Sequence, residues 1–314
     1  MTTLASITTF IDFAIDGVVN GSAYGLMGVS FGLIVAVTTR FHFAWAIGYA
    51  ICGFFTAYVV NHSGIPVLPA IVIGMAAAAL FSAACEALVY RPIAARTGSN
   101  ALLAVFVASF GITIAGQALI RLLVFGGTGA GNESLTWIAE SPIRIGDVGL
   151  TSLDLISVVV VWACAAALWG SLRYTGMGRR IRAVEVNTGM AKAVGIRTER
   201  AYVLVFVIAS LLAGVVALFD TMRSAANPEM GLTPVFYAFV VAFAAGLGRS
   251  PLWIMAVGTA LGVVEGVSAE FVSVKWQQVV VFGLLLLLLV VRAGQAWRPD
   301  IFRRPALRAR VGES

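Results

Sequence analysis

The chain has 314 residues, of which 60% are hydrophobic and only 11% are charged, and it carries a net charge of +6 with a mean hydropathy of +0.95. A soluble domain usually has about a quarter of its residues charged and roughly half apolar, so this composition excludes an ordinary soluble fold. It predicts an all-α polytopic membrane protein in which residues 1–314 form a single transmembrane domain.

Apolar runs of roughly 20 residues, each long enough to cross a bilayer as a helix, follow one another along the chain. The uncharged stretch Phe41 to Cys85 is long enough for two crossings, with "NHSGIP" (Asn61 to Pro66) as the turn between them. We expect eight to ten crossings in total, some of them interrupted. The other predicted segments are Gly17 to Thr39, Ala101 to Ile120, Leu155 to Leu172, Ala201 to Phe219, Met230 to Gly248, Pro251 to Val264 and Trp276 to Val291.

Glycines recur in the first predicted helix at intervals of three or four residues. Small residues at this spacing either let helix backbones approach closely or mark a helix that is interrupted inside the membrane. The sequence alone leaves both alternatives open for this set, which comprises Gly17, Gly21, Gly25, Gly28 and Gly32.

Signals for processing, metal binding and nucleotide binding are weak. The N-terminus has no basic region followed by a cleavage site, so the first apolar segment is expected to remain in the protein. Cys52, Cys85 and Cys164 lie singly in apolar segments, and we expect neither a disulfide nor a metal site. "GGTGAG" (Gly126 to Gly131) lacks the lysine of a phosphate-binding loop and suggests a flexible loop, so any ATP is expected on a partner chain.

The distribution of charge predicts which loops face the cytoplasm. Basic residues cluster at Arg91 and Arg96, in the loop 173–200 and in the tail 292–314, whereas the loop 125–150 carries mainly acidic residues. Short loops rich in Lys and Arg remain cytoplasmic. The three basic clusters are therefore expected inside and the loop 125–150 outside, and the basic pI is attributed to topology, not to nucleic-acid binding.

Three ionisable or aromatic features lie at membrane depth. Glu265 is expected to face the bundle interior, either as a hydrogen-bond partner or as part of a conduit, because a charge at mid-bilayer costs roughly 2.5 to 3.5 kcal/mol. Glu86 is expected to pair with a basic residue at a helix end. His42 and Trp45 are expected to share a helix face, either as an interfacial anchor or as a substrate contact at an interrupted helix.

An enzymatic interpretation is also open to test. "GVSFG" (Gly28 to Gly32) matches the G-x-S-x-G pattern of a serine hydrolase, with His42 and His62 as candidate bases. That pattern needs a strand-turn-helix context, whereas this one lies in a continuous apolar segment. We therefore expect Ser30 to belong to a small-residue packing face, and no catalytic residue is assigned.

Several segments, in order along nearly the whole chain, resemble the shorter permease subunit of branched-chain amino-acid ABC importers. "VVNGSAYGLMGVSFGLI" resembles the opening helix of that family, and "YRPIAARTGSNALLAVF" its Y-R-P-L segment. "GRRIRAVEVNTGMAKAVGI" is similar to the cytoplasmic loop that docks on the ATPase. "FAAGLGRSPLWIMAVGTALGVVE" resembles a late glycine-rich segment that ends on Glu265.

The resemblance implies an importer permease fold in the bacterial inner membrane and a role for each region. Its implied partners are a second permease subunit, two ATPase subunits and a periplasmic solute-binding protein. The implied coupling residues are Arg182, Glu185, Met190, Ala191, Gly195 and Ile196. The implied substrate path includes Asn20, Ser22, Tyr24, His42, Phe43, Trp45 and Glu265.

Two departures from the family pattern bear on the solute. His42, Trp45 and Ala46 replace members of an N-F-A-H-G element, and Ala245 and Arg249 replace small or polar residues. Relatives carry urea, short amides and aromatic acids, so these solutes are alternatives to a branched-chain amino acid. The competing class is an ion-coupled secondary transporter or a channel, which would need an embedded ion site built from residues such as Glu265 and His42.

Overall fold

The computed structural model describes residues 2–125, 131–138, 142–145 and 148–268, together with residues 279 and 283. The predicted crossing Trp276 to Val291 and the basic tail 292–314 therefore lie outside the described residues, apart from those two positions. The predicted total of eight to ten crossings stays a prediction for the same reason.

Six helices in the described part of the chain are long and apolar enough to cross a membrane. All six begin or end within a few residues of the predicted segments, and Val67 directly follows the predicted turn. The six spans are Ile11–Thr38 in α1 (Thr2–Thr38), Val67–Thr97 in α4 (Val67–Ala84) and α5 (Arg91–Thr97), Ala101–Val124 in α6 (Ala101–Phe125), α7 (Ser152–Tyr174), α10 (Thr198–Arg223) and α12 (Pro251–Ser268).

Interrupted helices are also present, as predicted. Helix α2 (Trp45–Ala50) continues through a π-helical segment (Ile51–Phe55) into α3 (Thr56–Ser63), which ends at the predicted turn before Pro66. A second π-helical segment, Cys85–Tyr90, joins α4 to α5. Pro92 follows it at the start of α5, where its missing N–H leaves a carbonyl of the preceding turn without its usual donor. Helix α11 (Leu232–Ala245) is shorter than a full crossing.

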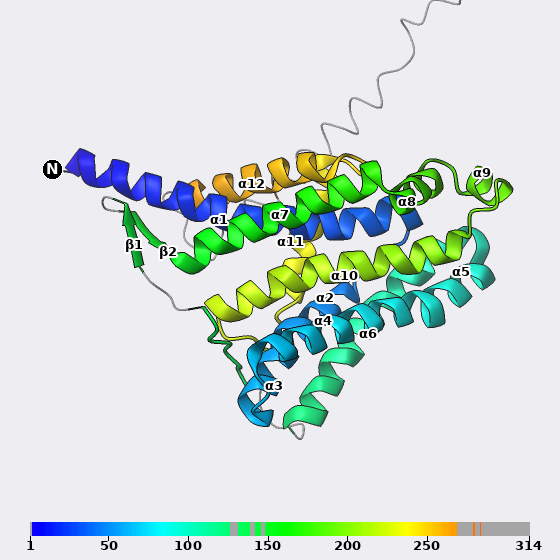
Figure 1. The fold of residues 1–314 in the computed structure, drawn as a ribbon, viewed down its shortest axis with the longest axis horizontal. Helices are drawn as coiled ribbons and strands as arrows, with labels where there is room; N and C mark the ends of the chain where they lie inside the picture. The colour runs from blue at the N-terminus through cyan, green and yellow to red at the C-terminus, as the bar shows by residue number, and fades with distance from the viewer. Residues whose placement is uncertain are drawn as a thin grey trace, which may run out of the picture.

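The two ends of the bundle differ (Figure 1). Helices α5, α8 (Gly176–Val186) and α9 (Thr188–Ala193) lie together at one end, which we call the α9 end. The antiparallel hairpin of β1 (Pro142–Ile145) and β2 (Val148–Thr151) lies at the opposite end. At the opposite end too, Glu133 pairs with Ala226, so the loops that follow α6 and α10 meet there.

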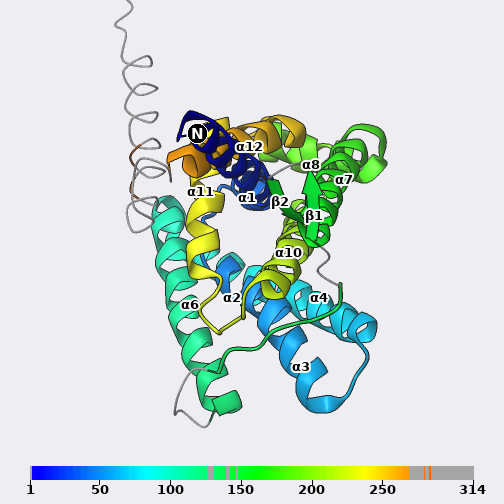
Figure 2. The ribbon, with the colours of Figure 1, turned by 90° about the vertical axis from the view of Figure 1, so that its left-hand side faces the viewer.

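Helix α1 is the centre of the fold, because it packs against α12, α11, α10 and α7. Viewed from the opposite end, α1, α12 and α7 lie at the top and α2, α3 and α4 at the bottom, with α11 on the left and α10 on the right between them and α6 along the left side (Figure 2). The close approach of α1 to α12 depends on glycines. A Cβ atom at Gly21 would lie 2.7 Å from the carbonyl oxygen of Thr259 and 2.8 Å from its Cα.

The glycine spacing in α1 therefore serves close packing, and no interruption occurs in this helix from Thr2 to Thr38. We expect Gly21→Ala to destabilise the protein by about 1–3 kcal/mol, because the added methyl group meets backbone that cannot move aside. The measurement is the free energy of unfolding in detergent. Gly111→Ala in α6 is the matched control, since a Cβ there meets nothing within 4 Å; equal destabilisation by both changes would contradict this packing role.

Candidate functional site

A polar chamber opens between α1, α10 and α11 near the end of the molecule opposite α9. Its volume is about 440 Å³, which is within the range of pockets that hold small ligands. It is lined by Asn20, Ala23, Tyr24, Met27, Asp220, Arg223, Ser224, Ala225, Asn227, Met230, Thr233, Pro234 and Tyr237.

The chamber contains one carboxylate and one guanidinium group, both from the last turn of α10. Asp220 accepts a short hydrogen bond from the Tyr49 hydroxyl group of α2. Arg223 Nη2 lies 3.0 Å from Asp154 Oδ1 of α7 and donates to Ser157 Oγ, while its buried Nε has no partner among the described atoms. Opposite charges one helical turn apart can bind the ammonium and carboxylate groups of one small zwitterion.

A stacked tyrosine pair forms another wall of the chamber. The rings of Tyr24 and Tyr237 lie 4.2 Å apart between centroids, with an interplanar angle of 10°. Glu265 accepts a hydrogen bond of 2.5 Å from the Tyr237 hydroxyl group. Glu265 does not line the chamber, so the structure places this carboxylate behind the tyrosines as their hydrogen-bond partner.

The chamber does not continue openly toward the α9 end. One turn beyond Met27 on α1, Phe31 packs edge-on against Phe43 and Phe239, at 6.0 and 6.1 Å between centroids. Phe239 lies on α11 beyond Tyr237, and Phe43 also contacts Phe106 of α6. This phenylalanine cluster fills the space between the chamber and the α9 end with apolar side chains.

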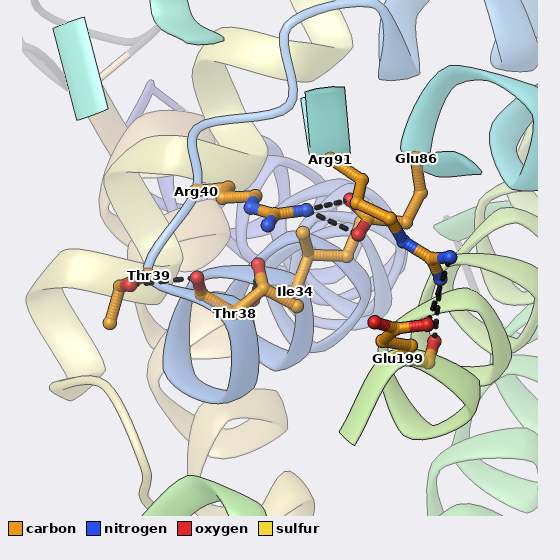
Figure 3. Close-up of polar contacts among 7 residues, drawn as sticks. All are labelled: Ile34, Thr38, Thr39, Arg40, Glu86, Arg91 and Glu199. Carbon is orange, nitrogen blue, oxygen red and sulfur yellow. Dashed lines mark hydrogen bonds and ion pairs between the residues drawn. The ribbon is translucent and has the colours of Figure 1, made fainter. Parts of the chain in front are cut away.

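A charged network holds the α9 end of α1 (Figure 3). Helix α1 ends at Thr38, whose hydroxyl group donates to the Ile34 carbonyl at 2.7 Å, and Thr39 has a positive φ of 53°. Arg40 then donates to both carboxylate oxygens of Glu86, and its guanidinium group lies over Tyr202 at 5.2 Å. The predicted pairing of Glu86 with a basic residue at a helix end is confirmed.

The partner of Glu86 is Arg40, which is distant in sequence, and not the nearby Arg91. Arg91 instead reaches Glu199 at the start of α10, with 3.1 Å between Nη1 and Oε2 (Figure 3). The two pairs together tie the break after α1 to α4, α5 and α10. The break after α1 is thus connected to the start of α10 through two ion pairs and the chain between Glu86 and Arg91.

The prediction that His42 and Trp45 share a helix face is wrong. His42 precedes α2, in the non-helical segment between α1 and α2, and both side chains are buried, so neither is an interfacial anchor. His42 Nδ1 lies 2.8 Å from the Tyr90 hydroxyl oxygen. Trp45 Nε1 donates to Ser30 Oγ at 2.8 Å. The expected interruption is present, but these two side chains make internal hydrogen bonds.

Ser30 is a structural residue. Its hydroxyl group donates to the Ala209 carbonyl at 2.7 Å and accepts from Trp45, so α1, α2 and α10 meet at this oxygen. It is completely buried in a continuous helix, and neither histidine contacts it. A nucleophile needs an adjacent base and access to substrate, so this geometry does not fit the hydrolase pattern.

Of the seven predicted path residues, Asn20 and Tyr24 line the chamber and Phe43 lies in the phenylalanine cluster. Ser22 is buried and bonds the Val18 carbonyl at 2.7 Å, so it is a packing residue. The sequence reasoning missed Asp220 and Arg223. Their signal was available, because these opposite charges directly follow the predicted segment Ala201 to Phe219 and are three residues apart.

The predicted coupling residues lie at the α9 end, and some of them are exposed whereas others are buried. Met190 is 66% exposed, together with its neighbours Val186 (85%) and Val194 (73%). Ala191, in contrast, is buried, so it anchors α9 to the rest of the protein and cannot itself touch a partner. These three exposed apolar side chains lie in α9 and at the residues that flank it, and such a group is typical of a protein interface.

Local hydrogen bonds define both ends of α9. Asn187 caps the start, where its Oδ1 accepts from the Met190 N–H at 2.9 Å. At the other end, the N–H groups of Gly195 and Ile196 donate to the carbonyls of Lys192 and Ala191 at 3.0 and 2.9 Å. This is a Schellman cap, which needs the left-handed conformation that Gly195 adopts at φ 83°.

The two remaining predicted coupling residues belong to α8. Arg182 Nη2 donates to the Arg173 carbonyl at 3.3 Å, which fixes α8 against the end of α7. Burial raises the pKa of the Glu185 carboxyl, and the positive charge of Arg182 opposes this shift. Arg182 therefore positions α8 in the structure, and Glu185 lies half-buried near it.

A bundle of apolar helices around a polar chamber, with exposed apolar residues in and beside α9 at the other end, is typical of a membrane transport protein. The chain matches the family described as "Branched-chain amino acid transport system / permease component" over residues 13–290. It therefore belongs to this family and is a permease subunit of an ABC importer, not an enzyme. Such permeases work with ATPase and solute-binding partners.

Known relatives cover almost the whole chain. The permease protein LivH of a high-affinity branched-chain amino acid transport system from Salmonella typhimurium is 28% identical over 305 residues, 93% of this chain and 97% of the relative. BraD from Pseudomonas aeruginosa, of the same description, is 25% identical with the same coverage. The solved structure of PsaBC from Streptococcus pneumoniae in complex with Fab is similar at a TM-score of 0.48, with 14% identity over 90% of this chain and 94% of that chain.

Proposed function

We propose that this permease carries a branched-chain amino acid across the bacterial inner membrane and that the polar chamber is the entry of its path. The observation that carries the proposal is the presence of the Asp220 carboxylate and the Arg223 guanidinium group, one helical turn apart, in a chamber whose other walls include Met27, Met230 and Pro234. A free amino acid offers an ammonium group, a carboxylate and, in this class, an apolar side chain. The chamber provides a complementary group for each of the three.

The departures from the family pattern support the same solute class. His42 and Trp45 differ from the family element, but neither lines the chamber, and both bond to protein groups. Their substitution therefore leaves the lining of the chamber unchanged. Urea and short amides carry neither an ammonium group nor a carboxylate, so they would form no charge-assisted contacts with Asp220 and Arg223, whose protein partners are Tyr49 and Asp154.

The proposed orientation places the α9 end in the cytoplasm. Arg91, Arg96 and the many basic residues of the loop 173–200 lie at this end, and positively charged loops remain cytoplasmic. The chamber then faces the periplasm, where a solute-binding protein would deliver the amino acid. The phenylalanine cluster closes the path on the cytoplasmic side, as an outward-facing state requires.

The proposed partners follow from this orientation. The exposed apolar residues around α9 would dock on one of two cytoplasmic ATPase subunits, which bind the ATP, and a second permease subunit would complete the path. Binding of ATP can change the permease only if the ATPase pair binds one state of the permease better than another. The two ion pairs near α5 and α10 provide a physical connection from α9 toward the phenylalanine cluster.

The test is uptake of labelled leucine by cells that express the chain with its ATPases and binding protein. We expect unlabelled isoleucine and valine to compete at the concentrations at which leucine does. Urea, a short amide and an aromatic acid are expected to leave uptake unchanged. Competition by one of these three, with none from isoleucine or valine, would overturn the proposed solute class while leaving the permease function intact.

A further inference from the structure

A groove of about 420 Å³ lies at the α9 end, between α1, α7, α8 and the start of α12. It is separate from the polar chamber, with which it shares no lining residue. Its inner walls are apolar and consist of Leu33 and Ala36 of α1, Leu168 and Leu172 of α7, and Ile254 of α12. The groove therefore extends over about two turns of α7 and offers space for a chain of methylene groups.

The mouth of the groove is strongly basic. Arg173, Arg182 and Arg249 border it, and Glu185 is the one carboxylate among its lining residues. Two other arginines at this end, Arg40 and Arg91, are paired with Glu86 and Glu199. Within the part of the chain that the structure describes, no carboxylate lies within ion-pairing distance of the three groove arginines.

Aromatic contacts place the mouth at the level of the membrane surface. The Arg173 guanidinium group lies 5.3 Å from the centroid of the Trp169 ring and 5.8 Å from that of Tyr174. Trp and Tyr are enriched where a helix passes from the hydrocarbon region into the headgroup region. Helix α7 ends at Tyr174, so the arginines lie at headgroup depth and the apolar walls lie at acyl-chain depth.

We infer that this groove binds an anionic phospholipid, with the phosphate between Arg173, Arg182 and Arg249 and part of one acyl chain against Leu33, Leu168 and Leu172. Three cations against one carboxylate favour a ligand with a net negative charge. A free phosphate would satisfy the arginines but leave the apolar walls exposed. A zwitterionic phospholipid would fill the walls but bring no net charge.

The inference requires only that α7 spans the membrane, and it does not depend on which solute is transported. The test is native mass spectrometry of the full chain in detergent, without solute or ATP, titrated separately with phosphatidylglycerol and phosphatidylcholine of the same acyl composition. We expect phosphatidylglycerol to be retained more strongly by the wild type. Each arginine near the membrane surface contributes about a fivefold effect, so Arg173→Gln with Arg249→Gln should weaken this retention by about 25-fold.

The matched control is Arg96→Gln with Arg179→Gln, which removes the same charge from exposed positions outside the groove. This control is expected to retain phosphatidylglycerol as the wild type does. A second variant, Ala36→Leu, fills the apolar part without changing charge and should also weaken retention. Equal retention of the two lipids, an equal loss in the control, or displacement of the lipid by millimolar inorganic phosphate would each overturn the inference.

Discussion

Replacing Asp220 with asparagine is expected to raise the KM for amino-acid uptake about 30-fold, with little change in the amount of protein in the membrane. The asparagine can still accept the hydrogen bond from Tyr49, so the local fold is kept while the negative charge is lost. Losing the negative charge that pairs with the ammonium group of the solute costs about 2 kcal/mol or more of binding free energy, which corresponds to an increase in KM of about 30-fold. The measurement is the concentration dependence of leucine uptake in proteoliposomes that contain the complete transporter.

Asp16→Asn provides the control for Asp220. Asp16 lies on α1 near the same end of the molecule, is exposed and does not line the chamber. Asp16 interacts electrostatically with Arg223 without lining the chamber, so its substitution removes a nearby negative charge and should still leave the KM within about twofold of the wild type. If Asp220→Asn transports leucine with an unchanged KM, then Asp220 does not bind the ammonium group and the chamber has a different role.

Replacing Met190 with aspartate is expected to weaken binding of the ATPase by about 30-fold and to abolish transport-coupled ATP hydrolysis. Met190 is 66% exposed on α9, and an apolar residue at the centre of an interface commonly contributes about 2 kcal/mol or more to binding. A carboxylate there would also have to lose its water of hydration. The measurements are co-purification of the ATPase and solute-stimulated ATP hydrolysis.

Substitutions at Gly195 test whether coupling depends on the backbone conformation that ends α9 or on the side chains that α9 exposes. Gly195→Val should impair coupling, because a β-branched residue is strongly disfavoured at φ 83°, whereas Gly195→Asn should retain it. Both side chains would point into open space, since a Cβ at this position meets nothing within 4 Å. Lys192→Ser is the surface control on α9. Equal loss in the valine and asparagine variants would show that the added side chain blocks the partner directly.

The predictions for Asp220 and Met190 concern sites near the two opposite ends of α10. In the proposed function, solute recognition depends on charges at the last turn of α10, and ATPase docking depends on α9, which precedes the first turn of α10. Between them lie the phenylalanine cluster and the Arg40–Glu86 pair, which fastens the break after α1. If Met190→Asp raised the KM for leucine but left ATPase binding unchanged, the separation of the two sites would be contradicted.

The sequence by itself determined the membrane class, most helix boundaries and the family. These properties depend on local composition: an apolar run of sufficient length must form a helix in lipid, because its backbone groups have no other partners there. The turn from Asn61 to Pro66 and the cap at Gly195 also depend on local conformational preference. The basic loop 173–200 could be recognised for the same reason, because charge is visible residue by residue.

Only the tertiary structure decided which side chains face the chamber. The sequence suggested His42 and Trp45 as path residues, yet their side chains form hydrogen bonds with Tyr90 and Ser30, which lie in other helical segments. Asp220 and Arg223 follow an apolar segment in the sequence, and the packing of α10 and α11 against α1 places both of them in the lining of one cavity. Which face of an apolar helix is buried depends on its neighbours, and no local pattern in a membrane helix specifies them.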